Sequence, residues 1–176
     1  MTVTLAAAED SYVDQNIPDT NYGTNTVIRV RSTTIGNPDH NQRTFARFDT
    51  SGIPPSATVV SATLRLFTYQ APTASRSYDA SRVTASWGQG SITWNNQPAV
   101  AGSATSTVAT GTANDVWLGW DVTADVQAFV NGGQANYGWR IKDQVESNPT
   151  DMEARIRSTE YTGTTYDPQL VVTYWP

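Results

Sequence analysis

The sequence contains no cysteine, so the chain can form no disulfide bond and offers no thiolate as a nucleophile or metal ligand. Histidine occurs once, at His40, and lysine once, at Lys142, so arginine supplies nearly all of the positive charge. No apolar run reaches the roughly 18 residues that a membrane-spanning helix requires. The chain also lacks a basic segment followed by an apolar one, and we expect that any signal peptide has been removed.

These absences limit the chemistry that the protein can perform. His40 lies in a polar loop, and there is neither a Gly-x-Ser-x-Gly motif nor a histidine or cysteine pair suited to catalytic zinc. The 16 acidic residues show no spacing that marks a catalytic pair, so a hydrolase or lyase is a minor hypothesis. The net charge of −5 disfavours nucleic acid or an anionic membrane as a partner. We therefore predict that the protein is not an enzyme.

Short segments of alternating polar and apolar residues fill most of the chain. Val27, Arg29 and Arg31 alternate with Ile28 and Val30, which is typical of a strand with one buried face. Clusters of Gly, Pro, Asn and Asp separate such segments, as in a β-sandwich or barrel. The predicted strands cover residues 10–13, 26–31, 44–49, 59–69, 81–85, 91–94, 105–109, 116–121, 137–142, 154–158 and 169–174.

One segment has helical rather than strand spacing. We predict that Thr123 caps a short helix over residues 124–130, with Asp125 in its first turn. The run 131–133, Asn-Gly-Gly, ends that helix. One short helix does not change the all-β class.

Several motifs occur in one order along nearly the whole chain. They are DSYV (10–13), PDTNYG (18–23), RTFARFD (43–49), SGIP (51–54), SATLRL (61–66), SW (86–87), ITWNNQP (92–98), WDVT (120–123), NYG (136–138), RSTE (157–160) and PQLVVTY (168–174). In this order they resemble the DNRLRE domain family and the jelly-roll carbohydrate-binding modules related to it, although the letters that name the family are absent. The resemblance implies one β-sandwich domain of jelly-roll type over residues 1–176. It also implies secretion, attachment to other domains, and, in some relatives, binding of acidic polysaccharides such as alginate.

Most cations lie on predicted strands between apolar neighbours, so alternation places them on outer sheet faces. If their strands adjoin, they form a basic strip that suits the carboxylates of a uronic-acid polymer through bidentate pairs. The alternative is that they pair with neighbouring Asp and Glu and contribute little. Arg157 follows the same strand pattern. The candidate ligand-binding cations are Arg29, Arg31, Arg47, Arg65, Arg140, Lys142 and Arg155.

Two further kinds of site are predicted. Aromatic rings stack on the C–H faces of sugars at low entropic cost, and Tyr69, Tyr78 and Trp117 are the candidates, with Tyr161 as a further ring near a loop end. A structural calcium ion needs six to eight oxygen ligands, which the loop containing Asp14, Asp19 and Asn21 offers. Alternatively, these side chains cap turns.

Together these features predict a non-catalytic carbohydrate-binding module, with an acidic polysaccharide or cell-surface glycan as its partner. The absence of cysteine fits a protein that is secreted to a bacterial or archaeal surface. The alternative hypothesis is a structural or adhesive spacer of a surface protein, without affinity for glycans. No cofactor is required by either.

Overall fold

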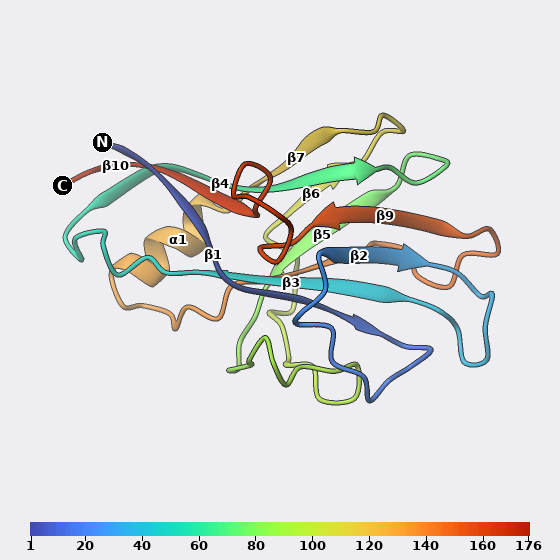
Figure 1. Cartoon of the computed structure of the whole chain (residues 1–176). Helices are drawn as coiled ribbons and strands as arrows, with labels where there is room; N and C mark the ends of the chain where they lie inside the picture. Colours follow the sequence, from blue (N-terminus) through green and yellow to red (C-terminus); the bar gives the residue numbers. More distant parts are fainter.

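The computed structural model describes all 176 residues, which form ten β-strands and one α-helix. In chain order these are β1 (Thr2–Asp14), β2 (Val27–Ser32), β3 (Gln42–Phe48), β4 (Thr58–Gln70), β5 (Ser77–Arg82), β6 (Ser106–Ala109), β7 (Val116–Asp121), α1 (Thr123–Val130), β8 (Trp139–Asp143), β9 (Met152–Arg157) and β10 (Gln169–Trp175). The all-β class with one short helix is confirmed (Figure 1). The helix is eight residues long, too short to cross a membrane.

Six of the strands close into a ring. The order β1-β10-β4-β9-β2-β3 returns to its start because β3 also pairs with β1. β7 extends the sheet from β4, and β8, β5 and β6 extend it from β3. All of these pairings are antiparallel. The closed ring is the observed architecture, and its classification as a jelly roll remains a prediction.

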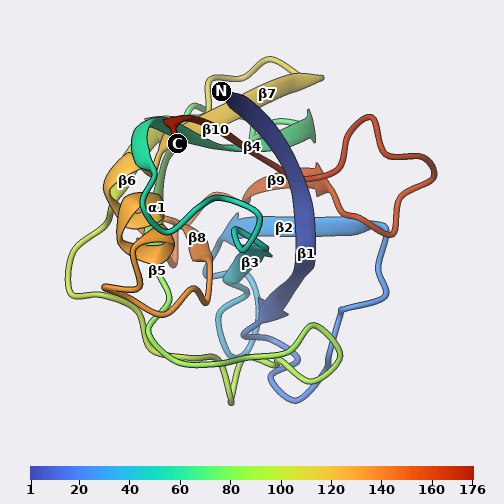
Figure 2. The same cartoon turned by 90° about the vertical axis from the view of Figure 1, so that its left-hand side faces the viewer.

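Strand β1 closes the ring by changing partners along its length. Its first half pairs with β10 and its second half with β3, with a register shift between Ala7 and Glu9 (Figure 2). The main core of 26 buried residues is formed by the ring strands together with β5, β7, β8 and α1, and it includes the fully buried Trp120 and Trp139. The Nε1 atom of Trp120 donates a hydrogen bond of 2.9 Å to the Tyr78 carbonyl oxygen, so burial leaves this polar atom satisfied.

The long connection between β5 and β6 covers a second, smaller core. Val13, Phe45, Val83 and Ile92 form this cluster on the outer face of β1 and β3. The predicted strand at residues 91–94 is wrong, because this stretch forms turns, with Ile92 N bonded to Gly88 O at 2.9 Å. Its apolar residues cover a sheet instead of joining one.

The helix also differs from its prediction at one end. Val122, not Thr123, is the N-cap residue of α1. The Thr123 hydroxyl instead accepts a hydrogen bond from Ala62 N at 2.9 Å, which ties the helix to β4. The Asp121 carboxylate accepts a bond of 3.0 Å from Thr123 N, so an acidic group still satisfies the first turn.

Candidate functional site

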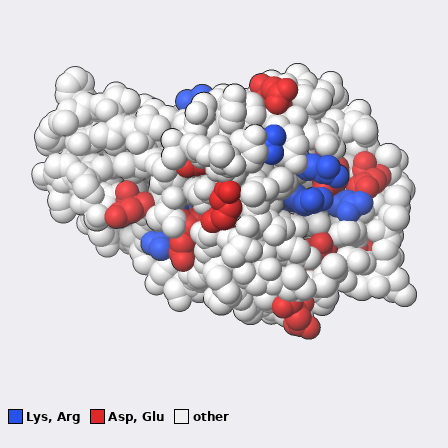
Figure 3. Space-filling model, in the orientation of Figure 1, with Lys and Arg blue, Asp and Glu red and all other residues white.

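The outer faces of β2 and β9 bring several arginines together. In β9 the residues Met152, Ala154 and Ile156 are buried, so the alternate positions Arg155 and Arg157 face outward. β2 has the same alternation and pairs with β9, which sets its arginines beside those of β9. Figure 3 shows these cations gathered over β9 and β2, with carboxylates at their side. Three of the predicted cations, Arg29, Arg31 and Arg155, therefore share one outer surface on these strands.

Part of the strip is neutralised by carboxylates. Glu153 lies 2.6 Å from Arg29 and 3.2 Å from Arg155, and it bridges the two strands. Arg31 forms two hydrogen bonds with Asp151, at 2.8 and 2.5 Å. The hydrogen bonds and charge of Arg31 hold the pKa of Asp151 below its ordinary value despite partial burial. These three arginines are thus held in place by protein partners.

Two arginines of the same outer surface have aromatic partners instead of carboxylates. The Arg157 guanidinium carbon lies 3.8 Å from the Tyr69 ring centre and 3.9 Å from that of Tyr161. The Arg65 guanidinium carbon lies 4.6 Å from the Trp117 ring centre. Eight of the chain's eleven cations contact a carboxylate, and the exceptions are Arg65, Arg157 and Arg140. The charges of Arg65 and Arg157 therefore remain available to a ligand.

Further aromatic rings extend the Arg65–Trp117 pair. Phe67 on β4 stacks on Tyr166 at 4.2 Å and meets Trp117 edge-on at 5.3 Å. Tyr161 and Tyr166 come from the loop between β9 and β10, and Trp117 comes from β7. We call this surface the arginine–aromatic face, which consists of Arg65, Phe67, Tyr69, Trp117, Arg157, Tyr161 and Tyr166.

The structure divides the predicted binding residues into separate groups. Six of them lie on the outer side of β2, β9, β4 and β7, namely Arg29, Arg31, Arg65, Tyr69, Trp117 and Arg155. Arg140 and Lys142 lie on β8, which joins the sheet on the other side of β3, and Lys142 pairs with Glu146 at 3.3 Å. Arg140 and Lys142 therefore do not belong to the group of cations on β2 and β9.

Tyr78 was predicted to stack on a ligand, and this prediction is wrong. Its side chain is completely buried in the main core, where the surrounding apolar residues raise the pKa of its hydroxyl. Sequence reasoning missed Tyr166 and Phe67. Phe67 is only 8% exposed, so it supports the other rings of the face and offers little surface of its own to a ligand.

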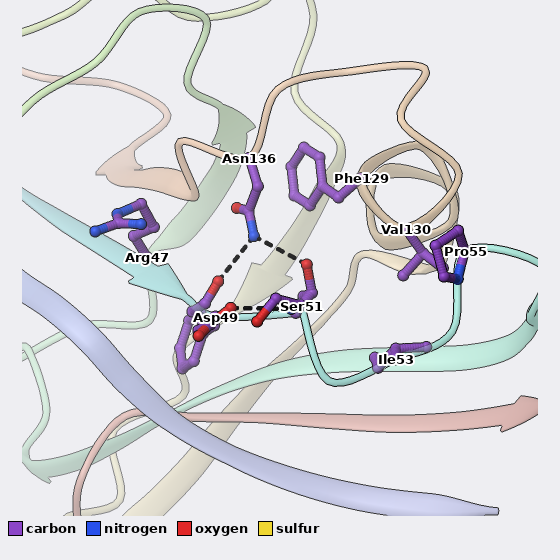
Figure 4. A pocket seen from close by; sticks show the side chains of 10 residues that line it. Arg47, Asp49, Ser51, Ile53, Pro55, Phe129, Val130 and Asn136 are labelled. Atoms are coloured by element: carbon purple, nitrogen blue, oxygen red, sulfur yellow. Dashed lines mark hydrogen bonds between the residues drawn. The ribbon is translucent and has the colours of Figure 1, made fainter.

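Arg47 lies in a different place, beside a cavity of about 420 Å³ (Figure 4). It pairs with Glu9 at 2.7 Å. The Asn136 amide, which also lines the cavity, is already used, because it donates hydrogen bonds to Phe48 O at 2.8 Å and to Thr50 Oγ1 at 3.2 Å. Asp49 also lines the cavity and forms no ion pair, and its carboxylate accepts a bond of 2.9 Å from Ser51 N. The cavity shares no residue with the arginine–aromatic face.

The predicted calcium loop is held by hydrogen bonds between protein groups. Asp14 Oδ2 accepts a bond of 2.7 Å from Gln42 Nε2, and Asp19 Oδ1 one of 2.7 Å from Asn95 Nδ2. Asn21 Oδ1 accepts a bond of 3.1 Å from the Gly23 amide. Only the Asn21 contact is a turn cap as in the alternative, whereas those of Asp14 and Asp19 join segments far apart in the sequence. Calcium at this loop stays a prediction.

His40 is half-buried and has fixed partners. Its Nε2 atom lies 2.9 Å from Asp14 Oδ2, and its Nδ1 atom lies 3.0 Å from Arg31 Nη1. The only other side chain that bonds to it is that of Gln42, at 3.2 Å. The hydrogen-bond partners of His40 therefore include no hydroxyl group that it could activate as a nucleophile.

A comparison with known protein families gives a match over nearly the whole chain. No curated protein matches it. The model of carbohydrate-binding module family 96 matches residues 1–174. This match confirms the resemblance to carbohydrate-binding modules, while the DNRLRE name remains a prediction. The chain therefore belongs to carbohydrate-binding module family 96.

Proposed function

We propose that this protein is a non-catalytic carbohydrate-binding module that holds an acidic polysaccharide on its arginine–aromatic face. One observation carries the proposal: Arg65 and Arg157 have no carboxylate partner and are held against aromatic rings on an outer sheet surface. The family membership supports the carbohydrate part of the proposal. The charge of the face supports the acidic part.

The chemistry of the face fits a uronic-acid chain. Ring stacking fixes the plane of each guanidinium and leaves N–H groups at its edge for two parallel bonds to a carboxylate, while Arg65 Nη1 also donates a long bond of 3.5 Å to Gln169 Oε1. Five arginines line β2, β9 and β4 here, against only the two carboxylates of Glu153 and Asp151. The local excess of positive charge on these three strands, in a protein of net charge −5, favours an anionic ligand there, and Glu160 and Asp167 lie beside it in the loop between β9 and β10.

The rings provide the second part of the contact. Tyr166 is 39% exposed, and Tyr69, Tyr161 and Trp117 are each partly exposed. Such rings can stack on the apolar faces of sugar units between the charged groups. Because polysaccharides of this kind lie outside cells, the proposal includes secretion and attachment to other domains of a surface protein or polysaccharide-degrading enzyme.

The proposal is tested by calorimetric titration with a uronic-acid oligosaccharide and with a neutral one of equal length. We expect binding of the acidic ligand alone, weakening as salt screens the charges. Arg65→Ala and Arg157→Ala each remove a charge-assisted contact of about 1.5–3 kcal/mol, so Kd rises roughly 10-fold or more. Arg140→Ala is the matched control, because Arg140 is also an unpaired strand arginine but lies on β8.

Equal weakening by Arg140→Ala would mean that net charge, and not this face, determines binding. Absence of binding to every glycan would favour the spacer hypothesis. Appearance of new reducing ends on incubation with the polymer would contradict the non-catalytic part of the proposal.

A further inference from the structure

Two carboxyl groups, those of Asp10 and Glu160, are linked through Thr159 and Gln89 where β1 passes the loop between β9 and β10, and Asp167 lies at the other end of that loop. Asp10 on β1 is completely buried, Asp167 at the end of the loop is 6% exposed, and Glu160 lies at the start of the loop. The Asp10 carboxylate points toward this loop, because its Oδ2 atom accepts a bond of 2.9 Å from Thr159 N. The loop is also bonded to β1 by Ala7 N, which donates to Pro168 O at 3.0 Å.

The negative charge of this group has no counterpart in the protein. None of the three carboxylates forms an ion pair with an arginine or lysine. The Asp10 Oδ1 and Glu160 Oε2 atoms are buried and have no hydrogen-bond partner. Burial and the neighbouring charge of Glu160 raise the pKa of Asp10 to about 7, and the same causes raise that of Asp167. Burial of these oxygens is costly unless a proton on Asp10 or a bound cation offsets the negative charge.

The surrounding residues form a fixed frame for these oxygens. The Gln89 side chain accepts a bond of 3.1 Å from Asp10 N and donates one of 2.7 Å to Gly23 O. Its amide also donates to Glu160 Oε1. Gln89 thus fixes the other oxygen of Glu160 and leaves Oε2 free.

We propose that this cluster binds a calcium ion, with Asp10 Oδ1 and Glu160 Oε2 as ligands and Asp167 as a third source of negative charge. Calcium takes six to eight oxygen ligands in flexible geometry, including backbone carbonyls and water. No three acidic or histidine side chains form a metal-binding group by themselves. Neutral oxygens must therefore complete the coordination. Magnesium, which requires near-ideal octahedral geometry, and zinc, which prefers nitrogen and sulfur, fit less well.

The ion would also affect the arginine–aromatic face, a consequence that rests on the proposed function. The loop that carries Glu160 and Asp167 also carries Tyr161, which stacks on Arg157, and Tyr166, which stacks on Phe67. Calcium bound between β1 and this loop would fix both rings in place. Glycan binding then costs less ordering and becomes tighter.

The test uses the whole protein freed of metal with a chelator. With 1 mM Ca²⁺ and a Kd near 10 μM, the melting temperature should rise by about 5–10 °C. Calorimetry should give one site, and Tb³⁺ should bind in competition with Ca²⁺. Asp10→Asn and Glu160→Gln should lose these responses. Asp10→Asn should also be at least as stable as the wild type in chelator, because the repulsion is reduced.

The control is Asp19→Asn, the same substitution at a residue of the originally predicted calcium loop, which should keep the full response. A wild type that shows neither Ca²⁺ binding nor a shift in melting temperature would overturn the site, as would Asp10→Asn with an unchanged Ca²⁺ affinity. Tb³⁺ titration reads binding even if a variant is unstable. If the chelator leaves glycan affinity unchanged, only the link between calcium binding and the arginine–aromatic face is overturned. Whether the protein binds a glycan at all is measured separately, by the calorimetric titration with oligosaccharides.

Discussion

The clamp of Arg157 between two tyrosines predicts that lysine cannot replace this arginine. Arg157→Lys keeps the charge but loses the planar group that contacts the Tyr69 and Tyr161 rings at 3.8 and 3.9 Å. Each cation–π contact at an exposed site is worth about 0.5–1 kcal/mol, and lysine retains at most one of them. We expect the melting temperature to fall by about 1–4 °C.

The larger effect should be on glycan binding. Loss of the bidentate contact removes about one charge-assisted hydrogen bond, so Kd for a uronic-acid oligosaccharide should rise about 10-fold. The salt dependence should stay that of the wild type, because the net charge is unchanged. Calorimetry at two salt concentrations measures both, with Arg140→Lys as control. If the Arg157→Lys variant bound the oligosaccharide with wild-type affinity, this prediction would be refuted. Binding at this position would then need only a positive charge and not the planar guanidinium.

Three other substitutions test the structure more widely. Burial acts to raise the pKa of Glu146, but the hydrogen bonds and charge of Arg43 outweigh burial, so the pKa is lowered. The ion pair therefore stabilises the fold above about pH 4.5. This stabilisation is lost as the pH falls through the lowered pKa of Glu146. Glu146→Gln should therefore cost about 2 kcal/mol at pH 7 and much less at pH 3, as measured by urea unfolding. Tyr78→Phe should leave glycan affinity unchanged and cost less than about 1 kcal/mol, because its hydroxyl makes only one long bond of 3.5 Å; weaker binding would contradict its place in the core. Gly23→Ala should destabilise by about 1–3 kcal/mol, because a Cβ there would lie 2.1 Å from Gln89 O, whereas Gly52→Ala, with no atom within 4 Å, should be tolerated.

Alternation along a strand made part of the site predictable. Ile28 and Val30 point into the core, so Arg29 and Arg31 had to point out, and the same holds around Ile156 for Arg155 and Arg157. This inference needs only neighbouring residues in the sequence. It indicated which side chains lie on an outer surface, but not which outer surface they share.

The rest depended on contacts between distant segments. Arg140 and Lys142 look like the other strand cations in sequence, but β8 pairs with β3 and β5, away from β9. Tyr166 reaches Phe67 from a loop that has no periodic pattern, so no local signal marked it. Tyr78 is buried because β5 lies between β6 and β8 against the core, which depends on strand order.

The central claim is that an acidic glycan binds the arginine–aromatic face. The most direct measurement is a titration of ¹⁵N-labelled protein with a uronic-acid oligosaccharide, followed by NMR of backbone amides and arginine side chains. We expect the largest shifts at residues 65–69 and 155–161 and at Tyr166, with the Nε signals of Arg65 and Arg157 among them. Shifts concentrated instead around Arg140, or around the cavity beside Arg47 and Asn136, would contradict it.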